Sequence, residues 1–300
     1  TNMKVRDVSL PTEMNQGLYR PQFERDNCGF GLIAQMDDKA SHWLIETAIE
    51  ALGNLTHRGA IGADGKTGDG CGLLLKKPDS FFKAIAEEHG YSLSPLYAVG
   101  MVFLSQDDAK ADFAQNAVAQ SLTKQGLEVL GWRDVPVKLE HVGDQAKQTL
   151  PYIRQFFIAR DILNEAQFER KLYVVRKRIA RAIRESALVE RGKVYICSLS
   201  ANTIVYKGML IADQVESMFQ DLSNPRVESA LALVHQRFST NTFPSWRLAQ
   251  PFRYLCHNGE INTVKGNINW MNSRKHSMKS KTLGNDLDKL WPIIENSPSD

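Results

Sequence analysis

The sequence lacks the features that would tie it to a membrane or to nucleic acid. One of its longest apolar runs, LYAVGMVFL at 96–104, is far short of the roughly 20 residues that a membrane helix needs. Thirty-seven basic residues against 34 acidic ones give a net charge of +3, with no basic block that could follow a phosphate backbone. We therefore predict no membrane association and no nucleic-acid partner.

Cysteines are few and far apart, and none belongs to a CxxC pair or has a histidine at zinc-binding spacing. This spacing predicts neither a disulfide framework nor a metal site. Residues 1–27 lack the apolar central stretch of a secretory signal, so the default location is cytoplasmic. In such a compartment a cysteine is most often a small buried apolar residue, which is our expectation for Cys71 and Cys256.

Segments with strand patterns alternate with segments with helix patterns. The expected strands are 29–35, 70–77, 95–104, 151–160, 193–210 with a turn at 200–202, 228–240 and 252–260; the expected helices are 41–59, 78–90, 107–126, 164–187 and one after 262. Such interleaving favours an α+β fold in which two sheets lie between layers of helices. The chain ends in ENSPSD, a pattern typical of a loop, so we expect the domain to be incomplete at residue 300.

Four polar, glycine-containing clusters fall at the predicted ends of strands and helices, where functional sites are usually built. They are NCGFG, THRGAIGADGKTGDGCG, HQRFSTNTFPSW and CHNGE. Each is a weak signal alone, because HRGA also suits the end of a helix and HNGE also suits a turn. Their chemistry has to be considered together.

Cys28 could act as a nucleophile only if a base takes its proton, and no histidine lies near it in the sequence. Cleavage of the Asn27–Cys28 bond would supply one, since a free α-amine with a pKa of about 7.7–8.0 can accept the thiol proton. An uncut peptide nitrogen cannot, because its lone pair is delocalised into the carbonyl. Attack on an amide also needs oxyanion donors, which the Asn258 side chain and the Gly259 N–H could provide.

The four clusters and the terminal ENSPSD, in this order, resemble the glutaminase domain of glutamate synthases, within the class II glutamine amidotransferases that use an N-terminal cysteine. HRG, RFST and HNGE are shared across that class, whereas GADGKTGDGCG and TNTFPSW are typical of glutamate synthases. The resemblance implies a propeptide at 1–27 and a type 2 glutamine amidotransferase domain at 28–300. It also implies the four-layer αββα sandwich of N-terminal-nucleophile hydrolases.

By this resemblance Cys28 is the nucleophile, and Asn258 with Gly259 forms the oxyanion hole. The propeptide would be removed at the Asn27–Cys28 bond. A chain still carrying residues 1–27 would then be an inactive precursor, because its α-nitrogen remains an amide.

The resemblance also implies four substrate-binding residues. Arg237 matches an arginine that pairs with the α-carboxylate of glutamine, for which a planar guanidinium is well suited. Thr240 matches a second ligand for the same end of the substrate. Asp300 matches the aspartate that holds the α-ammonium group, and Arg58 matches an arginine that closes over the site.

Simpler roles for some of these residues remain open. Arg58 could instead neutralise Asp64 or Asp69 in the glycine-rich loop. Asp300, at the end of the sequence, could be an exposed charge. His257, although next to Asn258, is expected to be a hydrogen-bonded structural residue, because the proposed mechanism already has a base.

The implied activity is hydrolysis of L-glutamine to L-glutamate and ammonia through a thioester, with the ammonia used to make glutamate from 2-oxoglutarate elsewhere in a longer chain. FMN and an iron–sulfur cluster would belong to that remainder, as would contact with a small electron-transfer subunit or ferredoxin. The electron donor stays open among NADPH, NADH and ferredoxin. Two alternatives also remain: an amidotransferase with another acceptor, such as phosphoribosyl diphosphate or a sugar phosphate, and a non-catalytic glutamine-binding module.

Overall fold

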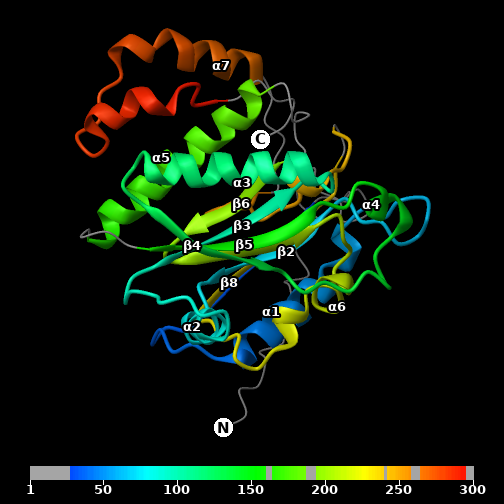
Figure 1. Cartoon of the computed structure of the whole chain (residues 1–300). Coiled ribbons are helices and arrows are strands. Elements are labelled where there is room, and N and C mark those ends of the chain that lie inside the picture. The colour runs from blue at the N-terminus through cyan, green and yellow to red at the C-terminus, as the bar shows by residue number, and fades with distance from the viewer. Residues whose placement is uncertain (1–27, 160–163, 187–193, 240–241, 258–263, 295–300) are drawn as a thin grey trace.

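Two antiparallel sheets of four strands each face one another, and helices cover the outer face of both (Figure 1). The computed structural model describes residues 28–159, 164–186, 194–239, 242–257 and 264–294. Helix α1 packs on the first sheet, and α3 and α5 pack on the second. The predicted α+β sandwich with layers in the order αββα is confirmed.

The first sheet brings the beginning of the described chain next to a segment about two hundred residues later. Its strand order is β1 (Gly29–Ala34), β8 (Leu231–Gln236), β2 (Cys71–Lys76) and β7 (Thr203–Gly208). Gly29 lies opposite Gln236 in the antiparallel register of β1 and β8. The residue before β1 therefore meets the residues that follow β8.

The second sheet contains a strand that the sequence pattern did not predict. Its order is β4 (Glu128–Asp134), β5 (Tyr152–Ala159), β3 (Ala98–Leu104) and β6 (Tyr195–Ser200). The unpredicted strand is β4, an edge strand with a register shift between Val129 and Gly131. Its glycine and its incomplete burial weaken the alternation on which strand prediction depends.

Helices α1, α2, α3, α5 and α7 follow the predicted segments with shorter bounds, whereas the short helices α4 and α6 were not predicted. They are α1 (His42–Asn54), α2 (Asp79–Glu88), α3 (Asp108–Thr123), α4 (Asp144–Gln148), α5 (Glu165–Glu185), α6 (Gln214–Met218) and α7 (Val264–Ser273). Short 3-10 turns lie at η2 (Thr56–Arg58), η3 (Gln220–Ser223), η4 (Trp246–Leu248), η5 (Lys275–Ser277) and η6 (Gly284–Leu290). The expected helix 41–59 is thus a helix followed by a separate turn, and that turn carries Arg58.

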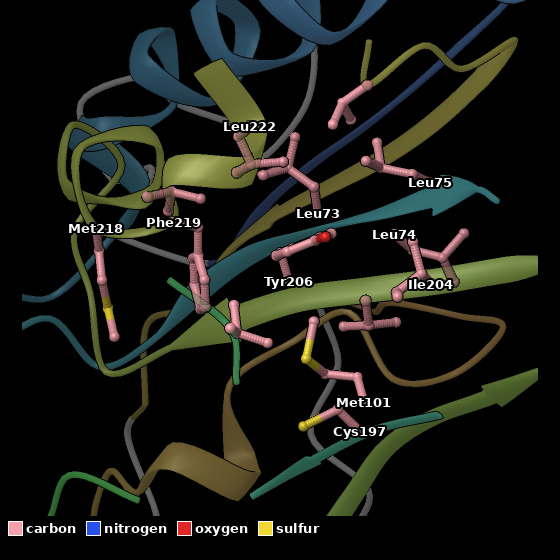
Figure 2. Packing of buried hydrophobic residues seen from close by; sticks show 14 of the residues in the cluster. Leu73, Leu74, Leu75, Met101, Cys197, Ile204, Tyr206, Met218, Phe219 and Leu222 are labelled. Carbon is pink, nitrogen blue, oxygen red and sulfur yellow. The ribbon is translucent and has the colours of Figure 1, made fainter. Parts of the chain in front are cut away.

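The apolar core fills the space between the sheets and continues to α1. Figure 2 shows Leu74, Met101 and Cys197 among the side chains of this cluster. A second cluster lies between the second sheet and helices α3 and α5. No helix of the described ranges is both long and apolar enough to cross a membrane.

The segment expected to form a strand at 252–260 is different in the structure. Up to residue 257 it is a loop with one isolated bridge between Phe252 and Leu255, and residues 258–260 lie outside the description. Tyr254 and Leu255 are more than half exposed. The loop is attached through Arg253, which donates to the Tyr195 hydroxyl at 2.9 Å, rather than through a strand ladder.

Candidate active site

Cys28 lies directly before β1, with its thiol against the main chain that follows β8. The Cys28 Sγ donates to the carbonyl of Phe238 at 3.5 Å and accepts from the N–H of the same residue at 3.3 Å. The thiol is only partly buried. Antiparallel pairing of β1 with β8 thus fixes a nucleophilic atom at the end of a sheet, while leaving it accessible.

Gly29 lets the turn that carries Arg58 lie close against the beginning of β1. A Cβ atom at Gly29 would lie 3.0 Å from the Cβ of Arg58 and 3.1 Å from the Cδ2 of Leu55. Contacts this close are rarely tolerated, so a side chain here would push η2 away from β1. The structure therefore places Arg58 beside the residue that follows Cys28; its closing over a substrate stays a prediction.

The alternative partners considered for Arg58 have donors of their own. The Asp64 carboxylate accepts from the N–H groups of Lys66, Thr67 and Gln145 and from the Thr67 hydroxyl. The Thr67 hydroxyl is the main cause of the lowered pKa of Asp64. We conclude that Asp64 organises the turn of the glycine-rich loop.

Arg237 is nearly buried one residue after β8, and two neutral oxygen atoms orient its guanidinium. Its Nη1 donates to the main-chain carbonyl of Asp69 at 3.3 Å, and its Nη2 donates to the Thr242 hydroxyl at 2.8 Å. Its own N–H donates to the carbonyl of Gly70 at 2.8 Å. The glycine-rich loop and the chain after β8 therefore both hold Arg237 next to the residue that contacts Cys28.

Asp69 and Ser239 complete this corner of the site. The Asp69 Oδ2 accepts from the N–H of Ser239 at 2.7 Å, and the Ser239 hydroxyl donates to the carbonyl of Thr242. Burial raises the pKa of Asp69, partly offset by the Ser239 N–H and the positive charge of Arg237. Sequence reasoning named Asp69 only as a possible partner of Arg58 and did not select Ser239 or Thr242, although all three lie inside the quoted motifs.

The main chain of His257 is hydrogen-bonded on both sides of its Cα. Its N–H donates to the Oε1 of Gln250 at 3.0 Å, and its carbonyl accepts from the Nε2 of His235 at 3.0 Å and the Nε2 of Gln250 at 3.5 Å. Both partner side chains are buried. The main chain of His257 is thus held by two side chains that the sequence analysis did not single out.

The other thiols are less suited to nucleophilic chemistry. Cys71 is fully buried, and burial raises its pKa well above the ordinary value. Cys256 is partly buried, and burial together with the nearby Cys28 raises its pKa to about 11. A high pKa keeps a thiol protonated and unreactive at neutral pH.

Several predicted site residues lie outside the described residues: Asn27, Thr240, Asn258, Gly259 and Asp300. The described part brings together Cys28, Arg237 and the turn that carries Arg58. It contains no group of three or more histidine, cysteine, aspartate or glutamate side chains that could hold a metal ion. The described geometry is therefore that of a partly buried cysteine whose thiol contacts the main chain of the residue after Arg237.

Comparison with known proteins identifies the family. The profile of the class-II glutamine amidotransferases matches residues 28–300. The chain belongs to this family. The match begins at Cys28, the residue that the sequence analysis selected as nucleophile.

Relatives with curated names are all similar to this chain over nearly its whole length. It is 44% identical to the "Glutamate synthase [NADPH] large chain" of Bacillus subtilis, over 95% of this chain and 19% of the relative. It is 42% identical to the "Ferredoxin-dependent glutamate synthase 1, chloroplastic/mitochondrial" of Arabidopsis thaliana, over 98% of this chain and 18% of the relative. It is 42% identical to the "Glutamate synthase [NADH]" of Schizosaccharomyces pombe, over 95% of this chain and 14% of the relative. The predicted resemblance is confirmed, and the chain spans less than a fifth of these relatives.

Proposed function

We propose that the chain, once freed of residues 1–27, hydrolyses L-glutamine to L-glutamate and ammonia. The observation that carries the proposal is the Cys28 thiol, held 3.3 Å from the N–H of Phe238 at the start of a strand. Arg237, next to Phe238 in the chain, brings a positive charge to the same end of the sheet. Membership of the class-II glutamine amidotransferases supports this reading of a thiol that would become N-terminal.

Substrate recognition would depend first on an ion pair between an arginine and the α-carboxylate of glutamine. The guanidinium of Arg237 would pair with the α-carboxylate of glutamine, and the carbonyl of Asp69 and the hydroxyl of Thr242 keep it in one orientation. Thr240 would add a hydrogen bond at the same end, and Asp300 would hold the α-ammonium group. Arg58, against Gly29, would close over the bound substrate.

Acylation would follow as the Cys28 Sγ adds to the side-chain amide carbon of glutamine. The thiol proton passes to the α-amine of Cys28, and the oxyanion is stabilised by the Asn258 side chain and the Gly259 N–H. When the tetrahedral intermediate collapses, the carbon–nitrogen bond breaks and the α-ammonium returns its proton to the leaving nitrogen. The products of this step are ammonia and a γ-glutamyl thioester on Cys28.

Deacylation would use the same groups in reverse. A water molecule gives a proton to the α-amine of Cys28 and adds to the thioester carbonyl. The carbon–sulfur bond then breaks, the sulfur recovers its proton from the α-ammonium, and glutamate leaves. One amine therefore serves both half-reactions, which explains why an uncut Asn27–Cys28 bond would stop the cycle.

The test compares uncut protein with protein that begins at Cys28, each verified by intact mass, in an assay of ammonia release from glutamine. We expect the uncut form to be slower by about 10²- to 10⁴-fold, the usual contribution of a positioned base. Mature protein with Cys28→Ala is the control that reports background hydrolysis. Equal rates for cut and uncut protein would exclude the amine as base, and mature protein no faster than Cys28→Ala would exclude glutamine hydrolysis.

In the longer protein the ammonia would aminate 2-oxoglutarate reductively, with FMN and an iron–sulfur cluster held by other domains. The names of the relatives support this, and they also include three electron donors: NADPH, NADH and ferredoxin. We assign no residue of this chain to either cofactor. A small electron-transfer subunit or ferredoxin would be the partner of those domains, and the location would be cytoplasmic.

A second function is a glutamine-binding module without catalysis, which the presence of residues 1–27 ahead of Cys28 favours. An electrophilic glutamine analogue separates the two functions. Covalent labelling of Cys28 in the mature protein supports the enzyme. Tight, reversible glutamine binding without labelling supports the module.

A further inference from the structure

His235, in β8, and Arg237, one residue after β8, are two polar side chains close to the main chain of Phe238 that contacts the thiol. Side chains alternate along a strand, so His235 and Arg237 share one face of the sheet and Gln236 lies on the other. The His235 Nε2 contacts the carbonyl of His257, and Arg237 reaches the glycine-rich loop. The end of β8 therefore carries His235, which contacts the main chain of His257, and leads directly into Arg237, the proposed carboxylate ligand.

The protonation state of His235 follows from its partner. A carbonyl can only accept, so the Nε2 of His235 carries the proton and donates to His257. Burial lowers the pKa of His235 to about 4, and the charges of Arg237 and Lys207 and the side chain of His257 act in the same direction. His235 is thus a neutral, fixed donor at physiological pH.

Gln250 is held in place by the chain that precedes it. The buried ammonium group of Lys207 in β7 donates to the carbonyl of Arg247 at 3.0 Å and to that of Ala249 at 2.6 Å. The next residue, Gln250, then bonds the N–H of His257 at 3.0 Å. The loop is therefore attached to the first sheet at two points, through Lys207 and through His235.

We propose that His235 and Gln250 are positioning residues for the oxyanion hole; this deepens the proposed function and rests on it. The carbonyl of His257 belongs to a planar peptide unit, so hydrogen bonds to this carbonyl restrict the direction in which the chain leaves His257. Oxyanion donors act only when held within about 0.5 Å of the productive geometry. His235 and Gln250 supply that constraint without touching the substrate.

The test compares mature proteins with three replacements of His235. His235→Phe removes the donor, His235→Asn has an amide too short to reach the position of Nε2, and His235→Gln places an amide N–H near it. With γ-glutamyl p-nitroanilide as substrate, we expect His235→Phe and His235→Asn to lower kcat about 10- to 100-fold, somewhat less than full removal of an oxyanion donor. His235→Gln should recover most of the loss.

Two further measurements separate positioning from general damage. The inhibition constant of L-glutamate reports the Arg237 end of the site, and the rate of thiol alkylation by iodoacetamide reports Cys28. Both should stay within about twofold of wild type in all folded variants, because neither requires a stabilised oxyanion. Tyr254→Phe is the matched control: it removes the bond from Tyr254 to Glu169 at 2.9 Å in the same loop, and it should leave kcat unchanged.

Each outcome has a definite meaning. Loss of kcat in His235→Asn with recovery in His235→Gln supports the proposal, and this pair suffices if His235→Phe fails to fold. Equal kcat in these two variants overturns it, as does a parallel loss of glutamate binding. An inactive wild-type mature protein would instead overturn the proposed function itself, so the two failures are distinguishable.

Discussion

Two buried arginines, Arg133 and Arg237, show how the same side chain serves two purposes in this fold. Arg133 in β4 donates two hydrogen bonds to the Asp221 carboxylate, at 2.6 and 2.8 Å, and one to Gln155 at 2.7 Å. The Tyr206 hydroxyl donates to the same carboxylate at 2.9 Å. This network joins strands of both sheets, and its positive charge meets a negative one inside the fold.

Arg237 is oriented differently, by the carbonyl of Asp69 and the hydroxyl of Thr242. These two oxygens carry no formal charge, and the positive charge of Arg237 also acts on the nearby Asp69 carboxylate, whose pKa it lowers. The Asp69 carboxylate, the acidic group nearby, accepts from the N–H of Ser239. The two arginines therefore differ in place and partners: Arg133 joins the two sheets through the Asp221 carboxylate, whereas Arg237 follows the strand that pairs with the beginning of β1, where we propose that it binds the substrate carboxylate.

The largest expected effect is on stability and comes from removing the Arg133 side chain. Arg133→Met leaves the Asp221 carboxylate buried without its partner, which typically costs about 3–5 kcal/mol of unfolding free energy. Urea unfolding of the mature protein measures this loss, while kcat per folded molecule should not change. In Arg133→Met/Asp221→Leu, which has no uncompensated charge, much of the stability should return. A single variant as stable as wild type would show that the network does not hold the sheets together.

Much of the architecture was predictable because local patterns report local structure. Alternating apolar residues predicted β1 and β8, and helical spacing predicted α5. The strand β4 was missed, because Gly131 and the partial exposure of its neighbours obscure the alternation. The segment 252–260 was predicted as a strand, but its described part is a loop. Its apolar residues do not reveal that Leu255 is exposed, or that Arg253 binds the loop to Tyr195 by a hydrogen bond.

The site was predictable in its chemistry but not in its assembly. The resemblance selected Cys28 and Arg237, while the contact of Cys28 with Phe238 joins positions 210 residues apart and follows from strand pairing. His235 and Gln250 could not be selected in this way, since their partner is a main-chain group of His257. A hydrogen bond to a carbonyl leaves no pattern of residue types in a sequence.

The second prediction concerns the role of Arg237 in binding glutamine. Arg237→Lys keeps the charge but loses the planar fork that matches a carboxylate. We expect the KM for glutamine to rise about 30- to 100-fold, equivalent to about 2–3 kcal/mol, with a smaller change in kcat. Arg226→Lys, at an exposed ion pair with Glu88, is the control and should have the KM of wild type. An unchanged KM in Arg237→Lys would assign the arginine to the fold, like Arg133.

A third prediction concerns the pH dependence of stability that arises from His235, the neutral hydrogen-bond donor in β8. Its pKa is about 4 in the folded protein against an ordinary 6.5, so the unfolded chain binds more protons between these values. Stability should therefore fall as the pH decreases through this window, by about 2 kcal/mol at pH 5 from this group. The measurement is the unfolding free energy at pH 7 and pH 5 for wild type and His235→Gln. The variant should lose about 2 kcal/mol less than wild type, and equal losses would show that His235 does not become harder to protonate on folding.

The smallest effect concerns the neutral oxygen that orients Arg237. Thr242→Val removes the hydroxyl that accepts from the Nη2 of Arg237 but leaves the bond from Nη1 to the carbonyl of Asp69. With one of the two orienting bonds intact, we expect the KM for glutamine to rise only about 3- to 10-fold, close to 1 kcal/mol, and Thr242→Ser to restore it. A rise as large as that of Arg237→Lys would mean that orientation contributes as much to binding as the guanidinium itself. No rise would mean that the Thr242 hydroxyl is not needed to orient Arg237 and that the remaining contacts, among them the bond from Nη1 to the Asp69 carbonyl, are sufficient.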